Sequence, residues 1–128
     1  MAEECLCKPT EILIFPCSGG ANVGQIVNEA AVKLTEEGTG KMFCLAGIGA
    51  HLDSIIEAAK TAKRIVALDG CSAECAKKTL EHAGIKITDH IDATKEGIAK
   101  NYSLKLTQSD VQLIVQRVKA DLKNQKTS

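Results

Sequence analysis

The chain has 128 residues, of which 45% are hydrophobic and 25% are charged, and its net charge is zero because 16 basic residues balance 16 acidic ones. This composition predicts one soluble globular domain with a single core. It lacks the basic surface and the aromatic stacking residues that nucleic-acid binding needs. No apolar run is long enough to span a bilayer. We therefore expect neither nucleic acid nor a membrane as a partner, and the sequence does not indicate a partner or an oligomeric state.

The first residues predict a polar leader over positions 1–9, without the apolar segment of a signal peptide. We therefore expect a cytoplasmic protein. In a reducing compartment, six cysteines favour metal binding or thiol chemistry over disulfides. Cys5 and Cys7 lie in the leader and are interpreted as incidental, with delivery of sulfur or metal to a main site as the alternative.

Apolar runs alternate with glycine-rich turns along the rest of the chain. Strands are expected at residues 11–16, 41–46, 64–69 and 85–91. Helices are expected up to about residue 37, over 50–62, over 72–82 with Ser72 as the N-cap, and from Thr107 onward. Residues 93–105 are expected to form a loop, and residues 123–128 a frayed tail. The whole chain, 1–128, is then a single domain.

Strands that alternate with helices predict an α/β fold. We expect a three-layer sandwich around a mainly parallel four-stranded sheet, Rossmann-like or flavodoxin-like, with the strand order 2-1-3-4. The point at which the connections change direction then lies between the first and third strands. Ligands bind at such switch points, outside the carboxyl ends of the strands.

Three cysteines, Cys17, Cys44 and Cys71, are evenly spaced along the chain, each in or just after an apolar run with glycines nearby. Parallel strands joined by right-handed crossovers end at the same edge of the sheet, so these thiols are expected to converge there. Cys75 follows Cys71 by one helical turn and would join them. Four thiolates are a common ligand set for tetrahedral zinc. The sequence therefore predicts a zinc site made by Cys17, Cys44, Cys71 and Cys75.

Other interpretations stay open at this point. Each cysteine alone is also typical of a small buried hydrophobic residue, above all Cys44, which falls inside a predicted strand. Four cysteines also suit an iron–sulfur cluster. A thiol-dependent enzyme, for sulfur transfer or reduction, would use Cys71 as its catalytic nucleophile and Cys17 or Cys75 to resolve the intermediate. Whether the protein is an enzyme is therefore left open.

Polar and glycine residues near the same edge offer further candidates. The loop Ser18, Gly19 and Gly20 before a helix resembles an anion-binding turn, or is simply a tight turn. It lacks the arginine of a cysteine-based phosphatase. Asp69 either lines the site or caps the following turn. His51 is either a substitute ligand or a partly buried polar residue.

The segments CSGGANVGQ, CLAGIGAH and DGC followed by ECAKKTLEHAGI resemble the DGC-domain family. The resemblance covers roughly residues 10–92, and the family takes its name from the motif found here at Asp69, Gly70 and Cys71. Its members are described as candidate zinc-binding proteins with four potentially chelating cysteines. The resemblance implies the ligands Cys17, Cys44, Cys71 and Cys75, and it implies no reaction. Metal or redox sensing and metal handling are the roles it leaves to consider.

Overall fold

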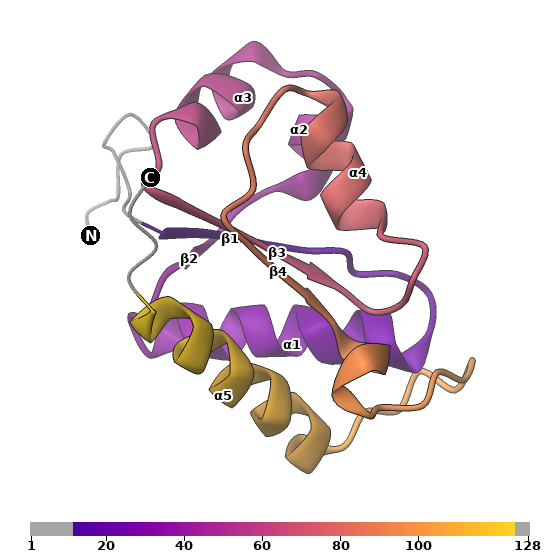
Figure 1. Cartoon of the computed structure of the whole chain (residues 1–128). Coiled ribbons are helices and arrows are strands. Elements are labelled where there is room, and N and C mark those ends of the chain that lie inside the picture. Colours follow the sequence, from indigo (N-terminus) through magenta and orange to yellow (C-terminus); the bar gives the residue numbers. More distant parts are fainter. Residues whose placement is uncertain (1–11, 125–128) are drawn as a thin grey trace.

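The computed structural model describes residues 12–124 (Figure 1). Its sheet contains four parallel strands in the order β2-β1-β3-β4. These strands are β1 (Ile12–Pro16), β2 (Lys41–Met42), β3 (Arg64–Asp69) and β4 (Asp89–Asp92). The predicted α/β class, parallel sheet and strand order are confirmed. The predicted leader with Cys5 and Cys7, and positions 125–128 of the predicted tail, lie outside the described residues.

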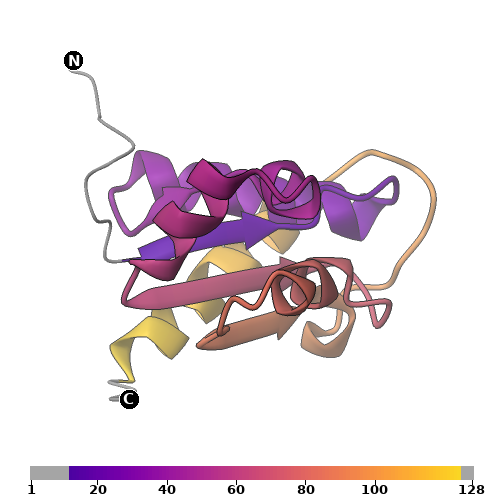
Figure 2. The same cartoon turned by 90° about the horizontal axis from the view of Figure 1, so that it is seen from above.

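Helices cover both faces of the sheet and make three layers (Figures 1 and 2). On one face lie α1 (Asn22–Glu36) and α5 (Gln108–Lys123), and on the other lie α2 (Leu45–Gly49), α3 (Asp53–Lys60) and α4 (Cys75–His82). A short 3-10 helix, η1 (Ala93–Glu96), follows β4. Buried residues of β1 alternate between the two layers, because Ile14 packs with α1 and α5 while Leu13 and Phe15 pack with the opposite helices.

The last helix begins where its sequence predicts. Thr107 is the N-cap of α5, and its Oγ1 accepts a hydrogen bond from the Asp110 N–H at 3.3 Å. The apolar residues at helical spacing, Val111, Ile114, Val115 and Val118, are all buried against the sheet.

Two boundary predictions are wrong in ways that matter for the site. The second strand ends at Met42, and Cys44 is the N-cap of α2 rather than a strand residue. The predicted helix over 50–62 is shorter in the structure, where α3 covers Asp53–Lys60, because the chain first closes a separate helix, α2 (Leu45–Gly49). Its closing hydrogen bonds are His51 N–H to Ile48 O at 3.0 Å and Leu52 N–H to Gly47 O at 3.1 Å. His51 then turns the chain with a left-handed φ of 58°.

The third predicted helix also begins later than expected, at Cys75 rather than next to Ser72. Its N-cap is Glu74, which has a left-handed φ of 57°. Likewise β4 begins at Asp89, several residues after the predicted start, and part of the predicted loop over 93–105 is the 3-10 helix η1.

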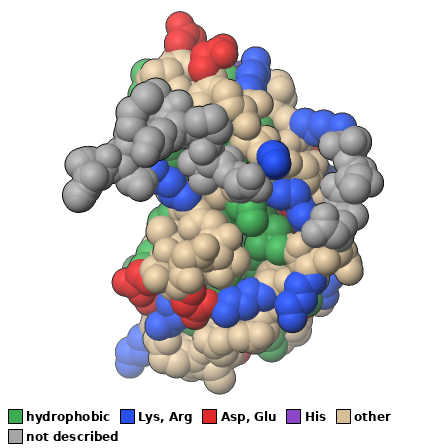
Figure 3. All heavy atoms as spheres, turned by 90° about the vertical axis from the view of Figure 1, so that its left-hand side faces the viewer, with side chains coloured by type: hydrophobic (Ala, Val, Ile, Leu, Met, Phe, Trp, Pro, Cys, Tyr) green, Lys and Arg blue, Asp and Glu red, His purple; other side chains and the backbone are tan. Residues whose placement is uncertain are grey.

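The two edges of the sheet present different surfaces. At the amino ends of the strands, Figure 3 shows lysine and arginine side chains around a patch of hydrophobic ones, with acidic side chains nearby. The carboxyl ends lie at the opposite edge, where the cysteines are. Within residues 12–124, no helix is both long and apolar enough to cross a membrane.

Candidate functional site

A pocket of about 240 Å³ opens at the carboxyl ends of β1 and β3. It is lined by residues of the stretches 17–24 and 69–75 and by Lys100 and Tyr102. Since β1 and β3 are neighbours in the sheet, this is the switch point at which a ligand site is expected.

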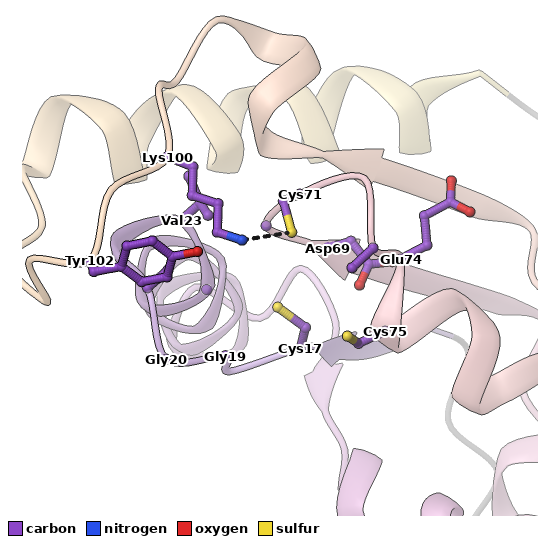
Figure 4. A pocket seen from close by; sticks show the side chains of 14 residues that line it. Cys17, Gly19, Gly20, Val23, Asp69, Cys71, Glu74, Cys75, Lys100 and Tyr102 are labelled. Atoms are coloured by element: carbon purple, nitrogen blue, oxygen red, sulfur yellow. Dashed lines mark hydrogen bonds between the residues drawn. The ribbon is translucent and has the colours of Figure 1, made fainter.

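Three of the four predicted ligands, Cys17, Cys71 and Cys75, line this pocket. Cys17 follows β1, Cys71 follows β3, and Cys75 opens α4. Figure 4 shows Cys17 and Cys71 pointing into the same space, with the sulfur of Cys75 beside it. The described cysteines are free thiols. We call this cavity the thiol pocket.

Cys17 and Cys71 are partly buried, whereas Cys75 is exposed. Burial raises the pKa of the Cys17 thiol, while hydrogen bonds from the backbone of Gly19 and Gly70 lower it less. Negative charge on Asp69 and Cys75 raises the pKa further. At neutral pH the Cys17 thiol therefore keeps its proton unless a cation enters the pocket.

Cys44 does not line the thiol pocket. It is exposed and borders a second hollow of about 440 Å³, and Cys17 lies between the two cavities because it lines both. The Sγ of Cys44 accepts a hydrogen bond from the Gly47 N–H at 3.3 Å, which caps α2. The turn into α2 therefore fixes the Cys44 thiol on its own helix.

Among the described residues, no group of three or more His, Cys, Asp or Glu side chains is arranged to hold a metal ion. The four-thiol zinc site therefore stays a prediction. The donor set nevertheless fits a soft metal, since three thiols line the pocket beside Asp69 and Glu74, although Lys100 also lines it. Cys17, Cys71 and Cys75 would hold such an ion, and Cys44, the remaining cysteine among the described residues, lines the adjoining hollow.

Asp69 lines the site and caps a helix, rather than the turn after β3. Its buried carboxylate accepts hydrogen bonds from the N–H groups of Ala76 at 2.7 Å and Lys77 at 3.1 Å, and so caps α4. The same carboxylate lines the thiol pocket and lies 2.8 Å from Nε2 of His90. Because Asp69 takes these first-turn donors of α4, Ser72 is not needed as a cap, which explains the late start of the helix.

A basic side chain that the sequence analysis missed faces the thiols. Lys100 Nζ donates a hydrogen bond to Cys71 Sγ at 3.6 Å and lies 5.4 Å from the centre of the Tyr102 ring (Figure 4). The charge on Cys71 raises the pKa of Lys100. The pocket therefore brings together three thiols and one ammonium group.

Asn22 holds the segment that carries Lys100. Its Nδ2 donates to the Ala99 carbonyl at 2.9 Å, and its Oδ1 accepts from the Asn101 N–H at 2.7 Å. Asn22 is buried although it lies at the first turn of α1. An asparagine directly after a glycine-rich turn could have been recognised as a candidate for side-chain hydrogen bonds. The sequence of residues 93–105 contains no pattern that identifies its partners there.

Two glycines allow the loops around the pocket to approach each other. A Cβ on Gly24 would lie 2.5 Å from the backbone N and O of Gly19, and a Cβ on Gly70 would lie 2.8 Å from the N of Gly24. Neither space can accept a side chain without moving the backbone. The two glycines therefore set how closely Cys17 and Cys71 are placed.

The candidate anion loop is engaged with its own helix. Ser18 Oγ donates to Asn28 Oδ1 at 2.6 Å, and Gln25 Nε2 donates to the Gly19 carbonyl at 3.0 Å. The N–H of Gly19 bonds to the Cys17 thiol. Gly19 and Gly20 line the thiol pocket. The loop is thus built to support the Cys17 thiol, and anion binding by Ser18, Gly19 and Gly20 stays a prediction.

Fold and pocket together define an α/β protein with a thiol-lined pocket at the carboxyl edge of a parallel sheet. The chain belongs to the DGC-domain family, whose model matches residues 13–118. It is also 33% identical over 90 residues to the anaerobic and virulence modulator AnvM of Pseudomonas aeruginosa, in an alignment that covers 70% of this chain and 69% of AnvM. No solved structure gives a significant match.

Proposed function

We propose that the thiol pocket binds one soft metal ion, zinc in the first instance, through Cys17, Cys71 and Cys75, with Cys44 as the fourth ligand. The observation that carries this proposal is that three thiols from two strand ends line one pocket. Zinc binds thiolates and releases their protons. The Gly19 and Gly70 N–H groups lower the pKa of Cys17 less than burial raises it, so the incoming metal ion itself must displace the Cys17 proton.

The fourth position is the demanding part of this proposal. Cys44 must leave its hydrogen bond with Gly47 N–H and turn towards Cys17, across the wall that the two hollows share. A hydrogen bond to a neutral thiol is weak, so its loss costs less free energy than a fourth zinc–sulfur bond provides. A site with one ligand that moves is suited to sensing or handling a metal rather than to a permanent structural role.

The relative from P. aeruginosa supports a regulatory reading. Its name describes a modulator of anaerobic behaviour and virulence. Thiolate sites respond directly to oxidants, because a thiolate that is oxidised no longer binds metal. Metal or redox sensing is therefore the role we favour for the pocket.

The test is native mass spectrometry with elemental analysis on protein purified without oxygen. We expect one zinc per chain, which is lost in the variants Cys71→Ser, Cys75→Ser and Cys17→Ser. The double variant Cys5→Ser/Cys7→Ser is the matched control and should keep the metal. Retention of zinc by Cys44→Ser would reduce the site to three thiols plus water. Iron with inorganic sulfide would replace the zinc proposal with an iron–sulfur centre.

A thiol-dependent enzyme is the second candidate, and the contact between Lys100 and Cys71 favours it. Cys71 would act as the nucleophile, and Cys17 or Cys75, which line the same pocket, would resolve the product as a disulfide. Protein without metal that carries a persulfide or mixed disulfide on Cys71 would support this candidate against zinc.

A further inference from the structure

Two segments of equal length, CLAGIGAH and CAKKTLEH, each begin with a cysteine and end with a histidine. They run from Cys44 to His51 and from Cys75 to His82, and they contain α2 and α4, which pack against each other. Cys44 and Cys75 lie at the starts of the two helices. His51 follows the end of α2, and His82 is the last residue of α4. The packing of α2 on α4 therefore pairs the two histidines as well.

The rings of His51 and His82 lie side by side, with their centres 5.3 Å apart and their planes at 70°. A metal ion held about 2.05 Å from an imidazole nitrogen lies about 3.2 Å from the ring centre, so two imidazoles at a tetrahedral angle have centres about 5.2 Å apart. The observed separation matches that of two imidazoles on one ion, and it is also within the range of edge-to-face ring packing. Both histidines are exposed, so rotation about their side-chain bonds can direct a nitrogen from each to a common point.

A hollow of about 370 Å³ lies beside the two rings. It shares Gly49 and Thr79 with the hollow of Cys44, and that hollow shares Cys17 with the thiol pocket. The three cavities therefore adjoin one another in a row. The first is lined by two imidazoles, the second by the thiol of Cys44, and the third is the thiol pocket, with Cys17 shared between the second and the third. The ligands become softer along this row, and a borderline ion such as zinc is bound by both kinds.

We propose that His51 and His82 form a second metal site, which binds one divalent zinc-like ion from solution and is the point from which the ion reaches the thiol pocket past Cys44. The binding stands on the imidazole pair alone, whereas the entry role rests on the proposed function. In the transfer the ion leaves two neutral imidazoles for thiols, each of which gives up its proton to solvent as it binds. No electrons are exchanged.

One feature of the pair supports a cation at this place. His82 is the last residue of α4, where the helix dipole favours positive charge. Lys78 lines the same hollow and opposes a cation, but its long side chain can carry the ammonium group out to solvent.

The experiment is a titration of the full chain with Zn²⁺, followed by ring nitrogen and proton NMR of its three histidines. We expect the signals of His51 and His82 to shift together with one dissociation constant. His51→Asn, which keeps a residue that tolerates the left-handed turn, and His82→Gln should each weaken this binding about tenfold or more, since even loss of an outer-shell partner costs about 10-fold to 100-fold. Lys78→Gln is the matched control and should bind as tightly or more tightly.

Failure of the inference and failure of the proposed function look different. If the thiol pocket takes up zinc while neither imidazole signal moves, the second site is overturned and the proposed function stands. If both imidazoles respond and the Cys71→Ser variant binds as much metal as the unchanged chain, the second site stands and its entry role is overturned. When both sites load, His51→Asn should slow metal uptake by the thiol pocket severalfold without changing its final occupancy, and an unchanged rate would overturn the entry role.

Discussion

Asn22 and Asn101 are joined by a reciprocal pair of hydrogen bonds. The N–H of Asn22 donates to the Asn101 carbonyl at 3.0 Å, and the N–H of Asn101 donates to Oδ1 of Asn22 at 2.7 Å. Residues far apart in the sequence are thereby fixed at the first turn of α1. Lys100 lies between Ala99 and Asn101, both of which Asn22 holds, so its ammonium group is presented to Cys71 by this link.

The first prediction concerns this link. Asn22→Ala removes the side-chain bonds to Ala99 and Asn101 and leaves their polar groups without those partners, so the free energy of unfolding should fall by about 1–3 kcal/mol. Urea denaturation followed by circular dichroism measures this change. Lys100→Met, which removes an exposed ammonium, should leave stability within about 0.5 kcal/mol. An Asn22→Ala variant as stable as the unchanged chain would show that the link does not hold the segment.

The second prediction compares Gly24, in the first turns of α1, with Gly20, which precedes the helix. A methyl group on Gly24 would meet the backbone of Gly19 at 2.5 Å, whereas on Gly20 it would meet nothing within 4 Å. Gly24→Ala should therefore destabilise the fold by about 1–3 kcal/mol, as overpacking does, while Gly20→Ala should change stability by less than about 0.5 kcal/mol. Thermal unfolding of the two variants provides the comparison. Equal melting temperatures would mean that the close approach at Gly24 is not required.

The third prediction is a pH dependence at Cys17. Burial raises the pKa of this thiol above its ordinary value of 9.0, so in metal-free protein it stays protonated at pH values where an exposed thiol has begun to ionise. Alkylation by iodoacetamide at pH 8 should therefore be slower at Cys17 than at the exposed Cys44 and Cys75. Peptide mass spectrometry over a time course measures each rate.

The same raised pKa has a consequence for stability. The folded state keeps the Cys17 proton to a higher pH than the unfolded chain does, so this group stabilises the fold fully below pH 9.0 and progressively less as the pH rises above it. Cys17→Ser should reduce the fall of stability on the alkaline side. Alkylation of Cys17 as fast as that of Cys75 would contradict both expectations.

Much of the fold follows from the sequence because hydrophobic periodicity and glycine turns are local signals. The parallel sheet, its order and the convergence of Cys17, Cys71 and Cys75 needed only those signals and the handedness of crossovers. The position of Cys44 depended on whether the chain after Met42 continues as a strand or turns into α2. That turn involves a tertiary contact, since a Cβ on Gly47 would lie 3.0 Å from the side chain of Ile55 in α3.

The polar half of the site could not be predicted for a different reason. Lys100 and Tyr102 line the thiol pocket, and Asn22 binds the backbone of Ala99 and Asn101 beside them. A hydrogen bond between residues so far apart in the sequence leaves no periodic pattern. The pairing of His51 with His82 likewise depends on the packing of α2 against α4. Both features lie beyond local sequence rules, although the residues that make them are chemically conspicuous.

The last prediction concerns the carboxylate of Asp69, which links α4 to the thiol pocket. It accepts the N–H groups of Ala76 and Lys77, so Asp69→Ala should expose the first turn of α4 and lower the free energy of unfolding by about 2 kcal/mol, the upper range for a lost cap. Hydrogen exchange of those two amides should accelerate, and because Cys75 opens the same turn, metal affinity should fall with it. Asp110→Ala is the control, since that carboxylate lies in the first turn of α5 and should cost only about 0.3–1 kcal/mol. Unchanged exchange at Ala76 and Lys77 in Asp69→Ala would show that α4 and its thiol are positioned by packing alone.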